Sequence, residues 1–251
     1  MKRFYCLVLL TFLLTGCAGS RNEGQRDFEP TPPEASAPKE GVIEMHVVGT
    51  PSGSLSEEDL NVAREGLRMG LQHVYRGEYD EAIRHLDDVL RIDPNAALAH
   101  YTRGVAYEAK GNIDEAMIDF EQAISIDSNF AQAYFGRGNV HRARGNYDQA
   151  IADFGQVIRI TPNSYNAYYN RGMAHYAKGD YDLAIADFGD AIRINPNFVR
   201  AYAHRGGTYA TTGDLDMAIA DFEAVLRIAP NSPEAEMARG NLEKARQLRE
   251  R

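Results

Sequence analysis

The sequence of 251 residues has only two cysteines and no tryptophan. Cys6 and Cys17 both lie near the N-terminus, so the long remainder of the chain contains no thiol. That remainder cannot form a disulfide, hold a metal through cysteine or use a cysteine nucleophile. We therefore expect its fold to depend on side-chain packing alone.

Basic residues are also scarce. The chain has 27 Lys and Arg against 36 Asp and Glu, a formal net charge of −9. Without Lys2 and Arg3, which precede an apolar run, 25 basic residues remain against the same 36 acidic ones. Because nucleic acids attract basic surfaces, we expect no nucleic-acid partner and no membrane contact through a basic patch.

Catalytic motifs are missing as well. The sequence has no GxxxxGK[ST], HExxH or GxSxG motif and no calcium-loop spacing of carboxylates. His73, His141 and His175 share a repeat position with Tyr107 and Tyr209. This exchange favours packing, because a zinc site needs three or four converging ligands. We expect no enzymatic activity, no catalytic residue, no cofactor and no metal.

Residues 1–16 are predicted to be a secretory signal. Lys2 and Arg3 precede an apolar stretch from Phe4 to Leu14. This stretch is too short to span a bilayer, which takes about 20 residues, and its position is typical of a signal peptide.

The segment that follows, Leu14-Thr15-Gly16-Cys17, resembles the lipobox of bacterial lipoproteins. In that family the signal is cut before the cysteine, so the resemblance implies that Cys17 carries lipid such as palmitate. Each buried CH₂ of an acyl chain contributes about 0.8 kcal/mol to membrane binding. Ala18 is not the aspartate of enterobacterial inner-membrane members, which implies the periplasmic face of the outer membrane. An ordinary signal peptide that contains a cysteine is the alternative.

Residues 17–53 are predicted to be a tether. Residues 21–41 are rich in Pro, Glu, Ser and Gly and poor in large apolar residues, so they cannot bury enough surface to fold. A flexible coil of about 36 residues spans on the order of 30–36 Å. The β-branched run Val42–Val48 could be an edge strand, a docking peptide or a segment lying loosely on the first helices.

A period of 34 residues organises the rest of the chain. One glycine series with this spacing comprises Gly70, Gly104, Gly138, Gly172, Gly206 and Gly240. A second comprises Gly77, Gly111, Gly145, Gly179 and Gly213. Alanines, phenylalanines and prolines keep the same register, with Leu86 in the first phenylalanine slot. This pattern resembles the tetratricopeptide repeat.

The resemblance implies an all-α fold, a right-handed solenoid of helix-turn-helix repeats over residues 54–250. Five repeats are expected at 63–96, 97–130, 131–164, 165–198 and 199–232. Residues 233–250 are expected to form a cap helix with an apolar stripe and a charged outer face.

The glycines have two predicted roles. Those of the Gly70 series let the second helix approach the first, which must outweigh a propensity cost of about 1 kcal/mol against alanine. Those of the Gly77 series end the first helix in a left-handed conformation.

Capping boxes are expected for three helices. The predicted pairs are Ser56 with Asp59, Asn112 with Glu115, and Asn146 with Gln149.

Charged residues recur in the same register. Arginines precede the first-helix glycines at Arg103, Arg137, Arg171, Arg205 and Arg239. Aspartates recur on the second helices at Asp119, Asp153, Asp187 and Asp221. A ladder of ion pairs between helices is the favoured interpretation, and an anion-binding stripe is the alternative.

The resemblance also implies a concave groove lined by the first helices. The positions that face it in the family correspond here to Tyr101, Glu108, Phe135, Asn139, Arg142, Asn166, Tyr169, Asn170, Met173, Tyr176, Arg200 and His204. Aromatic residues and Arg dominate binding hot spots, which favours a peptide ligand. Asn139, Asn170 and Arg200 match part of the family's carboxylate clamp, with Phe135 in place of its lysine.

The predicted function is a lipid-anchored scaffold of the bacterial envelope that binds proteins or peptides in this groove. The alternative is an assembly factor, or pilotin, for an outer-membrane secretion or pilus complex. The oligomeric state, the partner and the form of the ligand, helical or extended, are left open by the sequence.

Overall fold

A computed structural model describes residues 55–250 of the chain. The predicted signal and tether, with Cys17, lie outside this range. The described part is all-helical, as predicted, and contains no strand. Its helices are α3 (Glu57–Arg76), α4 (Tyr79–Ile92), α5 (Ala97–Ala109), α6 (Ile113–Ile126), α7 (Ala131–Ala143), α8 (Tyr147–Ile160), α9 (Tyr165–Lys178), α10 (Tyr181–Ile194), α11 (Val199–Thr212), α12 (Leu215–Ile228) and α13 (Pro233–Arg249). Between residues 55 and 250, none of them combines the length and apolarity needed to cross a membrane.

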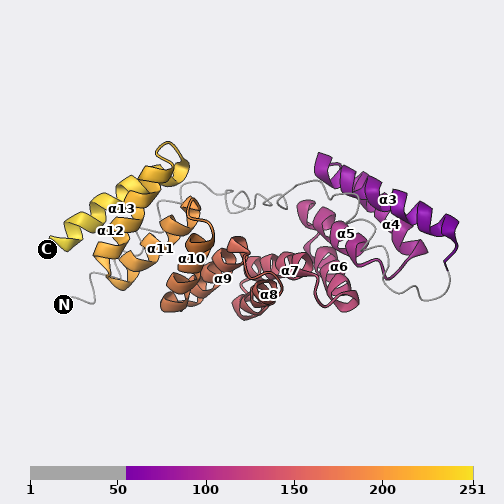
Figure 1. The fold of residues 1–251 in the computed structure, drawn as a ribbon, viewed down its shortest axis with the longest axis horizontal. Helices are drawn as coiled ribbons and strands as arrows, with labels where there is room; N and C mark the ends of the chain where they lie inside the picture. The colour runs from indigo at the N-terminus through magenta and orange to yellow at the C-terminus, as the bar shows by residue number, and fades with distance from the viewer. Residues whose placement is uncertain (1–54, 251) are drawn as a thin grey trace. The chain divides into compact units, whose positions relative to one another are not determined.

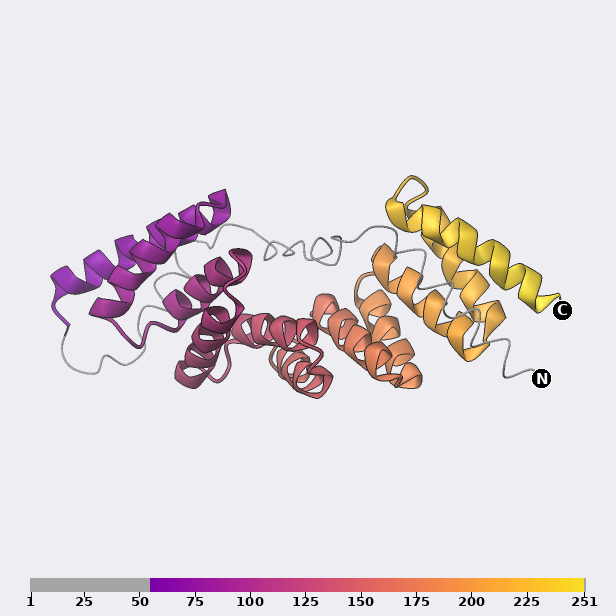
Figure 2. The same cartoon turned by 180° about the vertical axis from the view of Figure 1, so that it is seen from behind.

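The helices pack as successive hairpins. The chain divides into two compact units, an N-terminal one that includes residues 55–174 and a C-terminal one that includes residues 175–250. In the N-terminal unit α3 pairs with α4, α5 with α6, and α7 with α8. In the C-terminal unit α11 pairs with α12, and α13 packs on both. Figures 1 and 2 show α3 beside α4 and α11 beside α12 from opposite sides.

The first helices of neighbouring hairpins also touch each other in the N-terminal unit. Helix α3 contacts α5, and α5 contacts α7. A row of first helices is therefore continuous across α3, α5 and α7.

Glycine permits the close approach of the two helices in a hairpin, as predicted. A Cβ atom on Gly104 would lie 2.9 Å from Cε1 of Phe120, and one on Gly70 would lie 2.7 Å from Cγ of Leu86. Phe120 and Leu86 are both completely buried. The small residue on the first helix thus makes room for the large one on the second.

The second glycine series ends the first helices, also as predicted. Gly111 has φ 81°, and its N–H donates to Glu108 O at 2.9 Å while Asn112 N–H donates to Tyr107 O at 2.9 Å. These two bonds satisfy carbonyls at the end of α5 that have no partner within the helix.

The predicted capping boxes at Asn112 and Asn146 are wrong. Neither side chain caps its helix. In a capping box the backbone N–H of the cap residue donates to the side chain three residues further on. Here Asn112 N–H already donates to Tyr107 O and Asn146 N–H to His141 O. The tight link to the preceding helix therefore uses the donor that the box requires. At the start of α3, in contrast, Ser56 Oγ accepts from Asp59 N–H at 3.1 Å.

The arginine and aspartate series form the predicted ladder. Arg103 pairs with Asp119, Arg137 with Asp153, and Arg205 with Asp221, each through two hydrogen bonds of 2.7–3.0 Å. The three aspartates are buried, and a buried carboxylate requires such partners. This geometry supports the structural interpretation over an anion-binding stripe.

The cap helix α13 buries the predicted stripe of Ala235, Ala238, Leu242 and Ala245. Arg239 departs from the ladder and donates to Pro230 O at 2.6 Å. A Cβ on Gly240 would have no neighbour within 4 Å. Both differences arise because no described helix follows α13 to supply an aspartate and a phenylalanine.

Candidate functional site

Five of the predicted groove residues lie on the first helices α5 and α7 of the N-terminal unit. Tyr101 and Glu108 are on α5, and Phe135, Asn139 and Arg142 are on α7. All five are half-buried. We call these five residues the first-helix face.

The aromatic side chains of this face pack partly against the core. The Tyr101 ring lies 5.2 Å from that of Phe130 and 6.0 Å from that of Phe120, between centroids. Phe135 contacts Phe154 edge-on at 5.5 Å. Burial, assisted by the charge of Glu108, raises the pKa of Tyr101 to about 12. The rings therefore form an apolar base for this face.

Glu108 is the unusual residue of the first-helix face. Its Oε1 atom is buried and has no hydrogen-bond partner. Burial raises the pKa of its carboxyl group from 4.5 to about 7. A buried carboxyl without a partner is costly, so a ligand that donates a hydrogen bond or carries a positive charge would gain free energy here.

Arg142 is the second residue of this face with an unpaired polar atom. Its Nε atom is buried and also lacks an acceptor. Glu108 and Arg142 occupy equivalent positions in successive repeats, on helices α5 and α7, 34 residues apart. The face thus offers one unmet acceptor and one unmet donor, and a peptide backbone can satisfy both because each residue carries an N–H and a C=O.

The predicted residues on α9 differ in availability. Asn166, Asn170 and Met173 are half-buried, and Asn170 Nδ2 donates to Asn166 O at 2.9 Å within the helix. Tyr169 has only 8% of its surface exposed and belongs to the core. Its replacement would test packing more than ligand binding.

The remaining predicted residues belong to the C-terminal unit. The Tyr176 ring contacts Tyr181 at 5.5 Å, and His204 contacts Phe188 at 6.0 Å. The guanidinium of the exposed Arg200 lies over the Phe198 ring at 5.6 Å. Of the three residues that match the carboxylate clamp, Arg200 is therefore in the C-terminal unit, whereas Asn139 and Asn170 are in the N-terminal unit. It stays a prediction.

Sequence reasoning missed a cleft between α3 and α4. It has a volume of about 720 Å³, and its lining includes Val62, Gly66, Met69, His85 and Val89. The sequence does contain an indication of it. Gly66, Met69 and His85 occupy positions where other repeats have an aromatic residue, an arginine and an aspartate.

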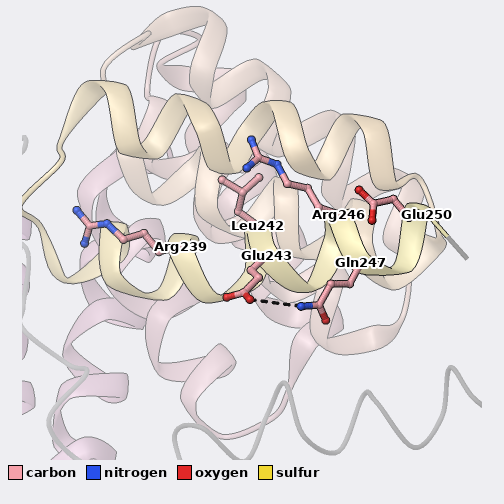
Figure 3. A pocket seen from close by; sticks show the side chains of 6 residues that line it. All are labelled: Arg239, Leu242, Glu243, Arg246, Gln247 and Glu250. Carbon is pink, nitrogen blue, oxygen red and sulfur yellow. Dashed lines mark hydrogen bonds between the residues drawn. The ribbon is translucent and has the colours of Figure 1, made fainter.

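A second hollow, about 230 Å³ in volume, runs along the outer side of the cap helix. Figure 3 shows its side chains projecting from α13 and its end, with Gln247 donating to Glu243 at 3.3 Å. Its lining residues are Arg239, Leu242, Glu243, Arg246, Gln247 and Glu250. Because they form one stripe of a single helix, the hollow is an open helix surface rather than an enclosing pocket.

His73, one of the three histidines that share a repeat position, packs against a neighbouring ring. His73 stacks on His85 at 5.2 Å and contacts Glu78 through Nδ1 at 2.6 Å. Across residues 55–250, no group of three or more His, Cys, Asp or Glu side chains is placed to hold a metal ion.

Family models identify the repeats. Models described as tetratricopeptide repeat match residues 67–131, 120–152, 165–198 and 199–232, and one described as TPR repeat matches residues 138–179. The comparison with curated proteins finds no match.

Solved structures share the fold. The crystal structure of MamA is 27% identical, and the match covers 66% of this chain and 91% of MamA with a TM-score of 0.62. YrrB, a TPR protein with an unusual peptide-binding site, is 22% identical, with 70% and 90% covered and a TM-score of 0.61. PilW, a widely conserved type IV pilus biogenesis factor, is 23% identical, with 74% and 90% covered and a TM-score of 0.64.

Proposed function

Residues 67–232 belong to the tetratricopeptide repeat family, and from this premise we propose that the chain is a scaffold that binds partner proteins or peptides. The binding surface is the first-helix face of α5 and α7. The chain acts by holding partners together and catalyses no reaction.

The observation that carries the proposal is the pair of unmet polar atoms at Glu108 and Arg142. Buried polar atoms in folded proteins nearly always have partners, and each one left alone costs about 1–3 kcal/mol. A peptide laid across α5 and α7 would offer an N–H or a cation to Glu108 and a carbonyl to Arg142. The rings of Tyr101 and Phe135 would support its apolar side chains.

We further propose that lipid on Cys17 anchors the chain to the periplasmic face of the outer membrane. The support is the sequence Leu14-Thr15-Gly16-Cys17 after a short apolar run. The 36 residues from Ala18 to Gly53 would separate the helices from the lipid by on the order of 30–36 Å if they form a flexible coil.

An assembly factor for a pilus or secretion complex is the second candidate. The likeness to PilW favours it, because that protein is a pilus biogenesis factor. At 23% identity the similarity shows a shared fold. A shared fold alone does not establish a shared function, because one fold serves many functions. Neighbouring pilus or secretion genes would favour this candidate, whereas neighbouring cell-wall or protease genes would favour the scaffold.

The test is a pull-down from crosslinked intact cells with two variants. Asn139→Ala/Arg142→Ala removes two polar groups of the face, whereas Arg84→Ala removes an exposed arginine of α4 that pairs with Glu81. Partners should be retained by wild type and Arg84→Ala and lost from the double variant. Partners that bind all three proteins equally would contradict the proposal.

A further inference from the structure

The cleft between α3 and α4 is lined by none of the five residues of the first-helix face. Its α3 lining includes Val62, Glu65, Gly66 and Met69. Glu65 and Gly66 each lie three or four residues from both Val62 and Met69, so the four residues share one side of the helix. Its α4 lining includes His85, Asp88, Val89 and Ile92. A ligand here would leave α5 and α7 free.

The first repeat differs from the others at three positions of this cleft. In the third and fifth repeats, Tyr134 and Tyr202 replace Gly66, and each ring packs on the arginine that replaces Met69, at 5.6 and 5.8 Å. That arginine pairs with the aspartate that replaces His85. The first repeat therefore lacks the packed tyrosine, arginine and aspartate side chains that occupy the equivalent position in the third and fifth repeats.

The preceding hairpin covers the equivalent surface of the second repeat. Arg103 Nη1 of α5 donates to Asp87 Oδ1 of α4 at 2.6 Å, and His100 Nε2 approaches Pro94 O at 3.1 Å. These contacts show what this side of a first helix is shaped to receive, namely a second helix and its following turn. No described helix precedes α3 to fill that position.

The lining has the character of an amphipathic docking surface. Val62, Met69, Val89 and Ile92 provide apolar contact, and Val62 is 54% exposed. The ionisable residues among the lining are His85 and the carboxylates Glu57, Glu58, Glu65 and Asp88, with no Lys or Arg. Arg68 and Arg91 pair with Glu65 and Asp88 from outside the lining, but both pairs are exposed and therefore weak.

We propose that this cleft docks an amphipathic helix of a partner protein whose polar face carries Lys or Arg. Its apolar side would lie on Val62, Met69 and Val89, where the second helix of a preceding repeat would pack. Its basic residues would meet Glu57, Glu58 and Asp88 at the rim. Charge complementarity selects this occupant over an acidic helix.

The test uses three labelled synthetic peptides of 14 residues and the full-length protein. One carries Leu at helical spacing with Lys elsewhere, the second has Glu for Lys, and the third scrambles the first. Fluorescence anisotropy should show binding of the Lys peptide alone, and added salt should weaken that binding because it screens exposed charges.

Two lysine substitutions at similarly exposed apolar positions locate the binding. Val62→Lys places a cation at the cleft, and Ile118→Lys does the same on α6, where Ile118 is 58% exposed. Val62→Lys should weaken Lys-peptide binding by about tenfold or more, the effect of losing a central anchor, whereas Ile118→Lys should leave it unchanged.

Several results would overturn the proposal. They are no binding of the Lys peptide to wild type, equal binding of the Glu or scrambled peptide, and equal losses in the two lysine variants. A concentration-dependent dimer that only Val62→Lys dissociates, seen by analytical ultracentrifugation, would identify a second copy of the chain as the occupant instead.

Discussion

Arg103 and Asp119 join helices α5 and α6 through two parallel hydrogen bonds, Nε to Oδ2 at 2.9 Å and Nη2 to Oδ1 at 2.8 Å. Asp119 is buried and also contacts His100 Nδ1 at 2.9 Å. Burial alone would raise the pKa of Asp119, but its bonds to Arg103 and His100 lower that pKa below its ordinary value. The pair fixes the position of α5, which carries Tyr101 and Glu108 of the proposed site.

Asp119→Ala should therefore destabilise the fold by about 3 kcal/mol or more, because it leaves the guanidinium of Arg103 without its buried partner. Asp88→Ala is the control, since Asp88 pairs with Arg91 on the exposed surface, and its loss should change stability by less than about 1 kcal/mol. Urea unfolding monitored by circular dichroism measures both. Similar values for the two variants would show that the ladder contributes no more than a surface pair.

Glu108 should give the fold a characteristic pH dependence. The pKa of its carboxyl is about 7 in the folded chain against 4.5 ordinarily, so the unfolded chain ionises first as pH rises. The folded state is then progressively disfavoured between about pH 4.5 and 7, by about 3 kcal/mol at pH 8. Glu108→Gln should be more stable than wild type at pH 8 and similar to it at pH 4.5.

Urea unfolding at both pH values provides that comparison, with Glu81→Gln as the control, since Glu81 pairs with Arg84 on the surface side of α4. A stability difference between Glu108→Gln and wild type that does not change with pH would show that Glu108 does not titrate in this range.

Two glycine substitutions separate packing from helix propensity. Gly104→Ala places a Cβ 2.9 Å from Phe120 and 3.2 Å from Asp119 Cβ, and such overpacking should cost about 1–3 kcal/mol. Gly240→Ala on α13 meets no atom within 4 Å and should stabilise the helix by up to about 1 kcal/mol. Thermal unfolding should show melting temperatures that shift in opposite directions. A lower melting temperature for Gly240→Ala would be contrary to this account.

The proposed anchor predicts different results for the two cysteines. Cys17→Ser should move the protein from the membrane fraction to the soluble periplasm, because no acyl chain can then be attached. Cys6→Ser should leave it in the membrane fraction, since Cys6 lies within the predicted signal. Cell fractionation followed by immunoblotting checks both. Membrane association of Cys17→Ser would rule out lipidation of this residue as the anchor.

The sequence predicted the parts of the fold that repeat. Gly104 and Phe120 recur in register with their equivalents, so a single packing rule accounted for the hairpins α3–α4, α5–α6, α7–α8 and α11–α12. The Arg103–Asp119 pair was predictable for the same reason. The capping boxes failed because the sequence shows which residues are good caps but does not show that Asn112 N–H is already bonded to Tyr107 O.

The candidate sites were harder to predict because they depend on differences between repeats. Register placed Tyr169 among the binding residues, yet packing around α9 buries it. The missing partners of Glu108 and Arg142 depend on individual side-chain positions, which no pattern encodes. The cleft beside Gly66 arises where the first repeat differs from the others. The repeat pattern describes what the repeats share, so it does not predict a feature that one repeat has alone.

Photo-crosslinking from the first-helix face tests the central claim most directly. A benzophenone amino acid is introduced in living cells at position 139, on that face, or at position 118, on the exposed side of α6. We predict a discrete crosslinked partner from position 139 that is absent from position 118 and is lost when Arg142→Ala is added. The same partner from both positions, or from position 118 alone, would contradict binding at the first-helix face.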